Sequence, residues 1–144
     1  MDRAQGSRGL HRGLLAALVL LSLLLGAFSA FVGWNKAFAP LDVLREHSAW
    51  TIHLPIWLGR VVGWLEMLAV AMLFAALAMP RLARFGLLAA AWITINHSVA
   101  AIFHVVNAEW HTLTQSAVLI PLCFAMTGLW WRRAKLLPKT GDRP

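Results

Sequence analysis

Four apolar stretches, each long enough to cross a bilayer as a helix, limit what this sequence can fold into. A membrane-spanning helix needs about 20 mostly apolar residues, because its backbone groups must bond to one another where water is absent. The sequence predicts spans at about residues 14–34, 58–79, 85–106 and 113–131. With 60% hydrophobic and 13% charged residues, the chain has more apolar surface than a soluble fold of 144 residues could bury. We therefore expect an all-α integral membrane protein, a four-helix bundle.

Basic residues indicate how the bundle is oriented in the membrane. Of the 13 Lys and Arg residues, ten flank one side of the predicted spans and only Lys36, Arg45 and Arg60 fall on the other. Basic residues concentrate on the cytoplasmic side of membrane proteins, so we expect the tails at residues 1–13 and 132–144 to be cytoplasmic. The net charge of +7 belongs to this flanking pattern and forms no single patch, so nucleic acid is not an expected partner.

The first apolar stretch allows a second interpretation. Basic residues at 8–12, an apolar core at 14–25 and small residues up to Ala30 are also typical of a signal peptide. Cleavage after about residue 29 would leave three spans with the same orientation. The apolar run continues through Trp34, which favours a membrane helix over a cleaved signal.

The first outer loop is predicted to contain a short amphipathic helix lying along the membrane surface. Leu41 and Leu44 stand near helical spacing with charged residues between them, and Pro40 and Pro55 bracket the segment. Tryptophans at the span ends favour the membrane interfaces. We expect an outer belt of Trp34, Trp50, Trp57 and Trp110 and an inner belt of Trp130 and Trp131.

Polar residues gather in the outer half of the spans. Glu66 and the pair Asn96 and His97 lie eight or nine residues from the outer ends of their spans, roughly 14 Å deep at 1.5 Å per residue. The inner halves, such as residues 69–78 and 118–126, are nearly all apolar. A channel or transporter would need polar residues across both halves, so this pattern favours a polar pocket open to the outer side and closed inward.

Glu66 is central to that pocket, because a carboxylate inside a bilayer is costly and usually has a partner or marks a site. Either His97 or Lys36 could hold it charged, and we hypothesise that Asn96 and His97 face it across the bundle. Glycines one and two turns earlier would let a neighbouring helix approach closely. The candidate pocket residues are Glu66, His97, Asn96, Lys36, Asn35, Arg60, His104 and Gln115, and the candidate helix-packing residues are Gly59 and Gly63.

His97, His104 and His111 form a stripe on the third span and the turn that follows it. A spacing of seven residues returns each almost to the same helix face, but it also separates neighbours by about 10.5 Å. One metal ion cannot bind two of them, since ligand bonds are near 2 Å. A metal or haem site would need a further ligand such as His53, His47 or Glu66, and a metal or haem is less favoured than a quinone as the cofactor. We expect His104 and His111 to be solvated near the interface.

Two sequence stretches carry a resemblance to a known family. FVGWNKAFAP follows the first span and WLGRVVGWLE opens the second, and the third span is rich in alanine. Together they resemble the DoxX-like family of small four-helix bacterial membrane proteins, over about residues 14–131. The resemblance implies a multi-pass protein of the bacterial cytoplasmic (inner) membrane, whereas the histidine stripe departs from the family pattern. The matching residues are Gly33, Lys36, Gly59, Gly63, Glu66 and Pro80.

The resemblance implies little about activity. Some relatives look like the membrane subunit of a thiosulfate:quinone oxidoreductase, and others resemble partners in membrane-associated redox complexes. The sequence has no nucleophile–base pair, phosphate loop or metal motif, so we favour a non-catalytic membrane subunit or partner module of a redox-linked complex. The alternative is a subunit that binds a quinone or another small molecule, in which Glu66 and His97 would hydrogen-bond its oxygens. A histidine-ligated metal or haem protein is the third possibility.

Overall fold

Four long helices and several short ones make up the protein. The computed structural model describes the backbone of residues 2–136 and the side chains from residue 12 onward; Met1, Pro138 and the rest of the predicted tail beyond residue 136 lie outside it. Each long helix is apolar and long enough to cross a membrane. The predicted helical membrane bundle is therefore confirmed. The long helices are α1 (Asp2–Phe38), α3 (Ile56–Ala78), α4 (Ala83–Val106) and α5 (Leu113–Leu136); the short ones are α2 (Leu41–Glu46), η1 (Trp50–His53), η2 (Pro80–Leu82) and η3 (Trp110–Thr112).

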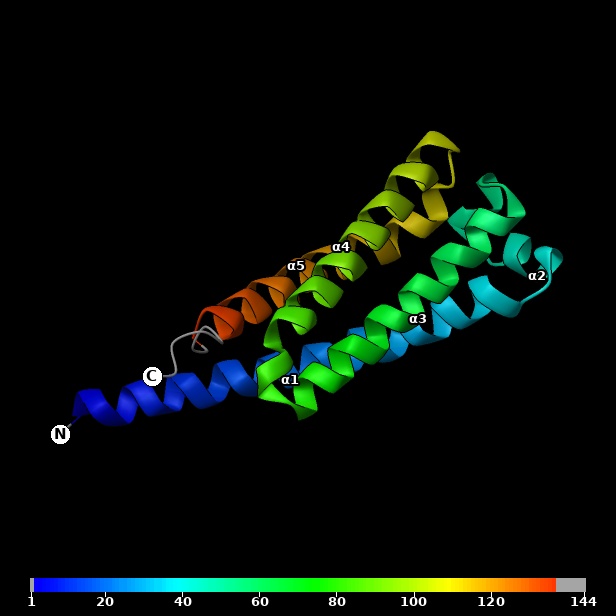
Figure 1. The fold of residues 1–144 in the computed structure, drawn as a ribbon. Helices are drawn as coiled ribbons and strands as arrows, with labels where there is room; N and C mark the ends of the chain where they lie inside the picture. Colours follow the sequence, from blue (N-terminus) through cyan, green and yellow to red (C-terminus); the bar gives the residue numbers. More distant parts are fainter. Residues whose placement is uncertain (1, 137–144) are drawn as a thin grey trace.

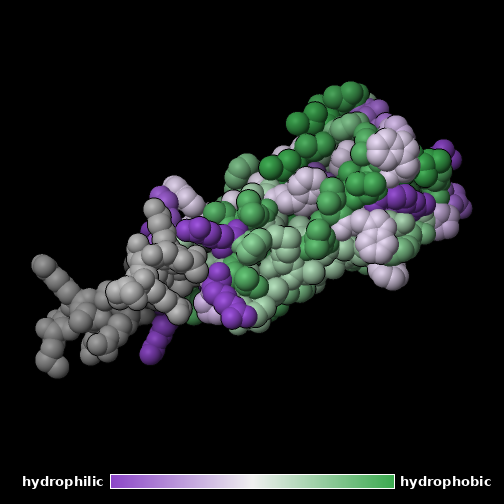
Figure 2. Space-filling view, in the orientation of Figure 1, coloured by the Kyte–Doolittle hydropathy of each residue, from purple (hydrophilic) through white to green (hydrophobic). Residues whose placement is uncertain are grey.

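The helices form two antiparallel pairs. Helix α1 packs along α3, α4 packs along α5, and α3 contacts α4. Figure 1 shows that α1 begins and α5 ends at one end of the bundle, which we call the terminal end, whereas α2 lies at the opposite end with η1 and η3, the loop end. Hydrophobic residues cover most of the middle of the visible face, and hydrophilic residues concentrate toward both ends (Figure 2). This distribution fits a bilayer around the middle of the bundle.

The terminal half holds a tightly packed core. Trp130 of α5 is fully buried against Gly86 of α4, where an added Cβ would clash with the indole ring. Its Nε1 donates a hydrogen bond of 3.0 Å to Ser22 Oγ, which fastens α5 to α1. The predicted inner belt is therefore half wrong: Trp131 is 53% exposed, but Trp130 points into the core because α1 offers its indole an acceptor.

The two helix pairs separate toward the loop end. Helix α1 contacts α5 far less than it contacts α3, and in Figure 1 the α4–α5 pair diverges from the α1–α3 pair away from the terminal end. Pro121 lies inside α5, between the fastened half and the separated half. A proline there removes one backbone hydrogen bond and favours a change of helix direction.

A lid formed by residues 41–53 folds over the loop end. Leu44 and Trp50 of this lid are only 5% and 7% exposed, and the Trp50 ring lies 5.0 Å from that of Phe103 between ring centroids. The prediction that Trp50 belongs to an outer aromatic belt is wrong, because η1 turns its side chain into the bundle. The other three members of that belt are exposed, and they are Trp34, Trp57 and Trp110.

Candidate functional site

A close approach of α1 and α3 lies at the base of the candidate site. A Cβ added to Gly63 would lie 2.6 Å from the backbone nitrogen of Ala37 and 2.7 Å from the carbonyl oxygen of Gly33. Both contacts are closer than real Cβ atoms tolerate, so only glycine fits at residue 63 without moving a helix. Gly59, the other candidate packing residue, instead faces Thr51 of the lid, 3.3 Å from where its Cβ would lie.

This approach brings together two oppositely charged side chains. Lys36 Nζ lies 2.7 Å from Glu66 Oε2, and their side chains are 3% and 0% exposed. Nζ also lies 5.5 Å from the centroid of the Trp50 ring, within the range of a cation–π interaction. Arg60 donates a hydrogen bond of 2.9 Å to the carbonyl oxygen of Lys36, which braces the last turn of α1. Of the two partners considered for Glu66 from the sequence, the structure has Lys36.

His97 has other neighbours than Glu66. Its Nε2 lies 3.4 Å from Ser29 Oγ of α1, and its ring is 5.7 Å from that of Phe28. Among the described residues, no hydrogen bond joins His97 to Glu66, whose Oε2 pairs instead with Lys36 of α1. Asn96 lies beside Glu66, as hypothesised, and its side-chain amide is placed to donate to the carboxylate, although no hydrogen bond of normal geometry joins its Nδ2 to the second oxygen, Oε1.

Several buried polar atoms around the ion pair have no partner. Among the described residues, Glu66 Oε1, Asn96 Nδ2 and Trp50 Nε1 are buried and form no hydrogen bond, and all three belong to residues next to Lys36 or Glu66. Leaving such an atom unpaired costs about 1–3 kcal/mol, so native proteins rarely do so without water or a ligand nearby. Of these three residues, only Trp50 lines the cavity described next.

A cavity of about 330 Å³ lies in the loop half, between α1, α4, α5 and the lid. This volume is at the lower end of the range for small-molecule pockets. Five of the candidate residues line it, whereas Glu66, Asn96 and Arg60 stand behind its wall. No Asp or Glu lines the cavity, and most of the remaining wall is apolar or aromatic. The lining candidates are Asn35, Lys36, His97, His104 and Gln115.

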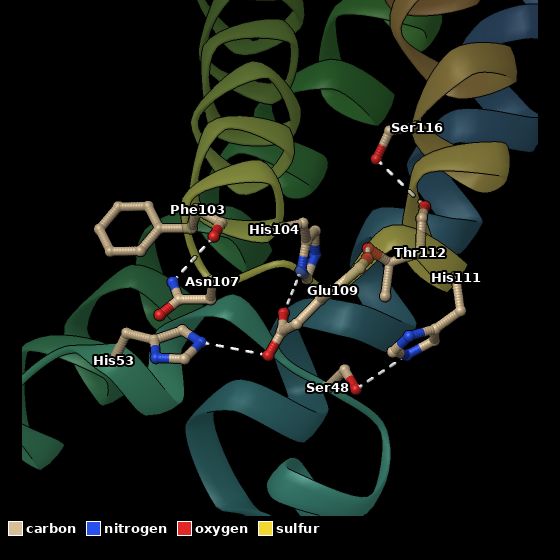
Figure 3. A network of polar contacts seen from close by, with 9 residues as sticks. All are labelled: Ser48, His53, Phe103, His104, Asn107, Glu109, His111, Thr112 and Ser116. Carbon is tan, nitrogen blue, oxygen red and sulfur yellow. Dashed lines mark hydrogen bonds and ion pairs between the residues drawn. The ribbon is translucent and has the colours of Figure 1, made fainter.

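A network of hydrogen bonds holds the lid to the turn between α4 and α5 (Figure 3). Glu109 lies between two histidines: its Oε2 is 2.6 Å from His104 Nδ1 and its Oε1 is 3.3 Å from His53 Nε2. His111 Nε2 lies 3.2 Å from Ser48 Oγ. Partial burial raises the pKa of the Glu109 carboxyl, but hydrogen bonds from the two histidines outweigh it, and the pKa is lowered from 4.5.

The stripe of histidines is therefore used in three different ways. His97 contacts α1, His104 contacts Glu109, and His111 contacts the lid. The prediction that His104 is solvated is wrong, since it is only 8% exposed and paired with Glu109. In the part of the chain that the structure describes, no three His, Cys, Asp or Glu side chains are placed to hold a metal ion, so the geometry does not favour the metal alternative.

Trp50, Ser29 and Glu109 were not among the predicted site residues. Trp50 looks like an interface tryptophan in the sequence, and nothing local indicates that η1 turns it inward. Ser29 is one small polar residue in an apolar run, which is unremarkable until its helix is paired with α4. Glu109 could have been found, because it follows His104 by five residues, directly after the end of α4.

A protein-family match covers most of the chain. A model of the DoxX-like family matches residues 15–126. No curated protein and no solved structure matches the chain. The matched region contains both members of the ion pair and all the residues that line the cavity.

Proposed function

The chain belongs to the DoxX-like family, and we propose that this multi-pass membrane protein is a non-catalytic subunit that binds a quinone-type small molecule for a redox partner protein. We place it in the bacterial cytoplasmic (inner) membrane. Because basic residues favour the cytoplasmic side, the terminal end would face the cytoplasm and the loop end would face outward. The ligand would then lie in the outer half of the bilayer.

The unused hydrogen-bond donors of the cavity carry this proposal. A lysine ammonium has three N–H donors, and Lys36 directs one of them to Glu66. Trp50 lines the same cavity, and its buried Nε1 has no acceptor among the described residues. No Asp or Glu lines the cavity, so the acceptors in its wall are neutral amide, hydroxyl and imidazole groups, whereas Lys36 supplies a charged donor. These groups favour a ligand that carries acceptor oxygens.

The balance of charge favours a neutral ligand. The ammonium of Lys36 is already matched by the carboxylate of Glu66, so the buried pair has no net charge. An anion would bring an additional charge out of water, which costs several kcal/mol unless a second cation compensates. A carbonyl oxygen can accept from Lys36 without that cost. The aromatic rings of Phe28, Phe31 and Trp50 supply flat apolar walls beside these donors, and a quinone combines both requirements.

The role of a subunit follows from what the cavity residues can do. Their side chains can hold and orient a carbonyl compound by hydrogen bonds, but none of them accepts electrons. Cys123 is the chain's one cysteine, and it is buried in the core of the terminal half, away from the cavity lining. We therefore assign electron transfer to a partner protein, and ligand binding to this chain.

Equilibrium binding of a benzoquinone with a decyl tail to the protein in lipid nanodiscs tests the proposal. The variant is Lys36→Met/Glu66→Leu, because replacing both members of a buried ion pair by apolar residues of similar size generally keeps a protein folded. Losing a hydrogen bond to a charged donor is worth about 1.5–3 kcal/mol, so affinity should fall roughly tenfold to 150-fold.

Lys135→Met is the matched control, since Lys135 is exposed at the end of α5. It removes the same charge far from the cavity and should leave the affinity unchanged. Equal affinity of the wild type and the double variant, or no binding by the wild type, would refute the proposal.

A further inference from the structure

The side of the cavity that faces the loop end is crossed by polar connections. The lid is held by Ser48 to His111 at 3.2 Å and by His53 to Glu109 at 3.3 Å, on two sides of the turn between α4 and α5 (Figure 3). Leu44 and Trp50 of the lid are buried and line the cavity beneath these bonds. A molecule arriving from the water at this end would have to displace an ordered, hydrogen-bonded segment.

The side of the cavity between α1 and α5 is different. Its wall there is apolar on α1, with Phe28, Phe31 and Val32, and on α5 it changes from the polar Gln115 and Ser116 to the apolar Leu119 away from the loop end. Phe31 lines the cavity and is also 68% exposed, so the cavity reaches the outer surface of the bundle beside it. These residues belong to helices that are apolar enough to cross a membrane. Phe28 is ten residues before the end of α1, roughly 15 Å below the loop end.

Helices α1 and α5 are joined near the terminal end of the bundle but leave a gap between them nearer the loop end. Trp130 and Ser22 fasten α5 to α1 in the terminal half, and no hydrogen bond between side chains joins the two helices in the described residues nearer the loop end. The small side chains of Ala100 and Ser116 line the cavity from α4 and α5 and leave its depth open. Pro121 lies in α5 between the part of the helix that is bonded to α1 and the part that borders the gap.

We infer that the ligand is an amphiphile that enters from the bilayer between α1 and α5, with its acceptor head at Lys36 and Trp50 and its apolar tail in the gap beside Phe31. This inference rests on the proposed function and adds the class of ligand and its path. A tail in this gap stays among apolar groups like those of lipid, so it need not cross water. The polar head of the ligand leaves the membrane interface, and hydrogen bonds from the unused donors of the cavity replace those it made there.

Photolabelling tests where the tail lies. The probe is a benzoquinone whose decyl tail ends in a photoreactive diazirine, added to the wild-type protein in nanodiscs and mapped by peptide mass spectrometry. Excess unlabelled decyl benzoquinone defines the specific fraction. We expect specific labelling within residues 28–32 and 116–119, because these segments border the gap.

Two variants of α5 control the experiment. Ser116→Trp places an indole in the gap and should reduce specific labelling about tenfold, since an overfilled apolar site costs about 1–3 kcal/mol. Ala117→Trp adds the same ring at the next residue, which is exposed and does not line the cavity, and should leave labelling unchanged. If Ser116→Trp fails to fold, Ala100→Leu narrows the same gap from α4.

The outcomes separate this inference from the proposed function. Specific labelling of lid residues 43–50 in place of the gap would overturn the bilayer path while leaving the quinone site intact. Equal labelling of the wild type and Ser116→Trp would also overturn it. No specific labelling, together with no binding of decyl benzoquinone to the wild type, would overturn the proposed function and with it the inference.

Discussion

Substituting Gly63 by alanine is the sharpest test of the packing that creates the ion pair. The added methyl group would lie 2.6 Å from Ala37 N, 2.7 Å from Gly33 O and 2.9 Å from Lys36 Cβ. Two of these are backbone atoms of α1, which cannot rotate away as the end of a side chain could. The helices must therefore move apart, and Lys36 moves away from Glu66 as they do.

The expected loss of stability combines two opposing effects. Overfilling a packed site costs about 1–3 kcal/mol, and the upper half of that range applies where backbone must move. Alanine is the better helix former, by roughly 0.5–1 kcal/mol. The free energy of unfolding of Gly63→Ala should therefore fall by about 1–2.5 kcal/mol. Gly128→Ala is the matched control, because nothing lies within 4 Å of its added Cβ; it should be neutral or slightly stabilising.

The single cysteine of the protein can be used to follow unfolding in this assay. Cys123 is its one cysteine and is fully buried in the core, so a thiol-reactive fluorophore signals unfolding during an SDS titration or on heating. The expected order of stability is Gly128→Ala, wild type, Gly63→Ala. A Gly63→Ala protein as stable as the Gly128→Ala protein would refute the close approach of α1 and α3, and with it the geometry of the candidate site.

Three further predictions use the same unfolding assay or hydrogen exchange. Lys36→Met or Glu66→Leu alone should cost about 3–5 kcal/mol, because each leaves a buried charge unpaired, and the double variant should recover most of that loss; losses that simply add would contradict a buried pair. Because the pKa of Glu109 is lowered from 4.5, its contribution should be complete above pH 4.5 and disappear as pH falls through the lowered pKa. Glu109→Gln should remove that acid dependence and speed hydrogen exchange in lid residues 41–53, and unchanged exchange would argue against its role in holding the lid. Trp130→Phe and Ser22→Ala should each cost about 1 kcal/mol, and the double variant should cost less than their sum, since both lose one hydrogen bond.

The four helices could be predicted because the length of an apolar run determines whether it can cross a bilayer. The same sequence pattern indicates how deep in the membrane a residue lies. It is a much poorer guide to the direction in which the side chain points. Trp50 and Trp130 illustrate the difference. Both stand at the depth of a membrane interface, yet both are buried, because their indoles turn toward groups on helices that are distant in the sequence.

The candidate site was predictable in part for the same reason. Lys36, Glu66 and Gly63 could be selected from the sequence, since a buried charge requires a partner and small residues allow close packing. Their pairing depends on α1 lying against α3, which no local pattern reveals. The network around Glu109 was missed because it joins the lid to the turn after α4, two segments that meet only in the folded protein.

Native mass spectrometry of the protein after gentle extraction from its own membrane tests the central claim most directly. The wild type should retain one quinone-sized molecule per chain, and the Lys36→Met/Glu66→Leu variant, shown to be folded by the Cys123 assay, should not. An empty wild-type protein that also fails to take up added decyl benzoquinone, or equal retention by the wild type and the variant, would contradict it.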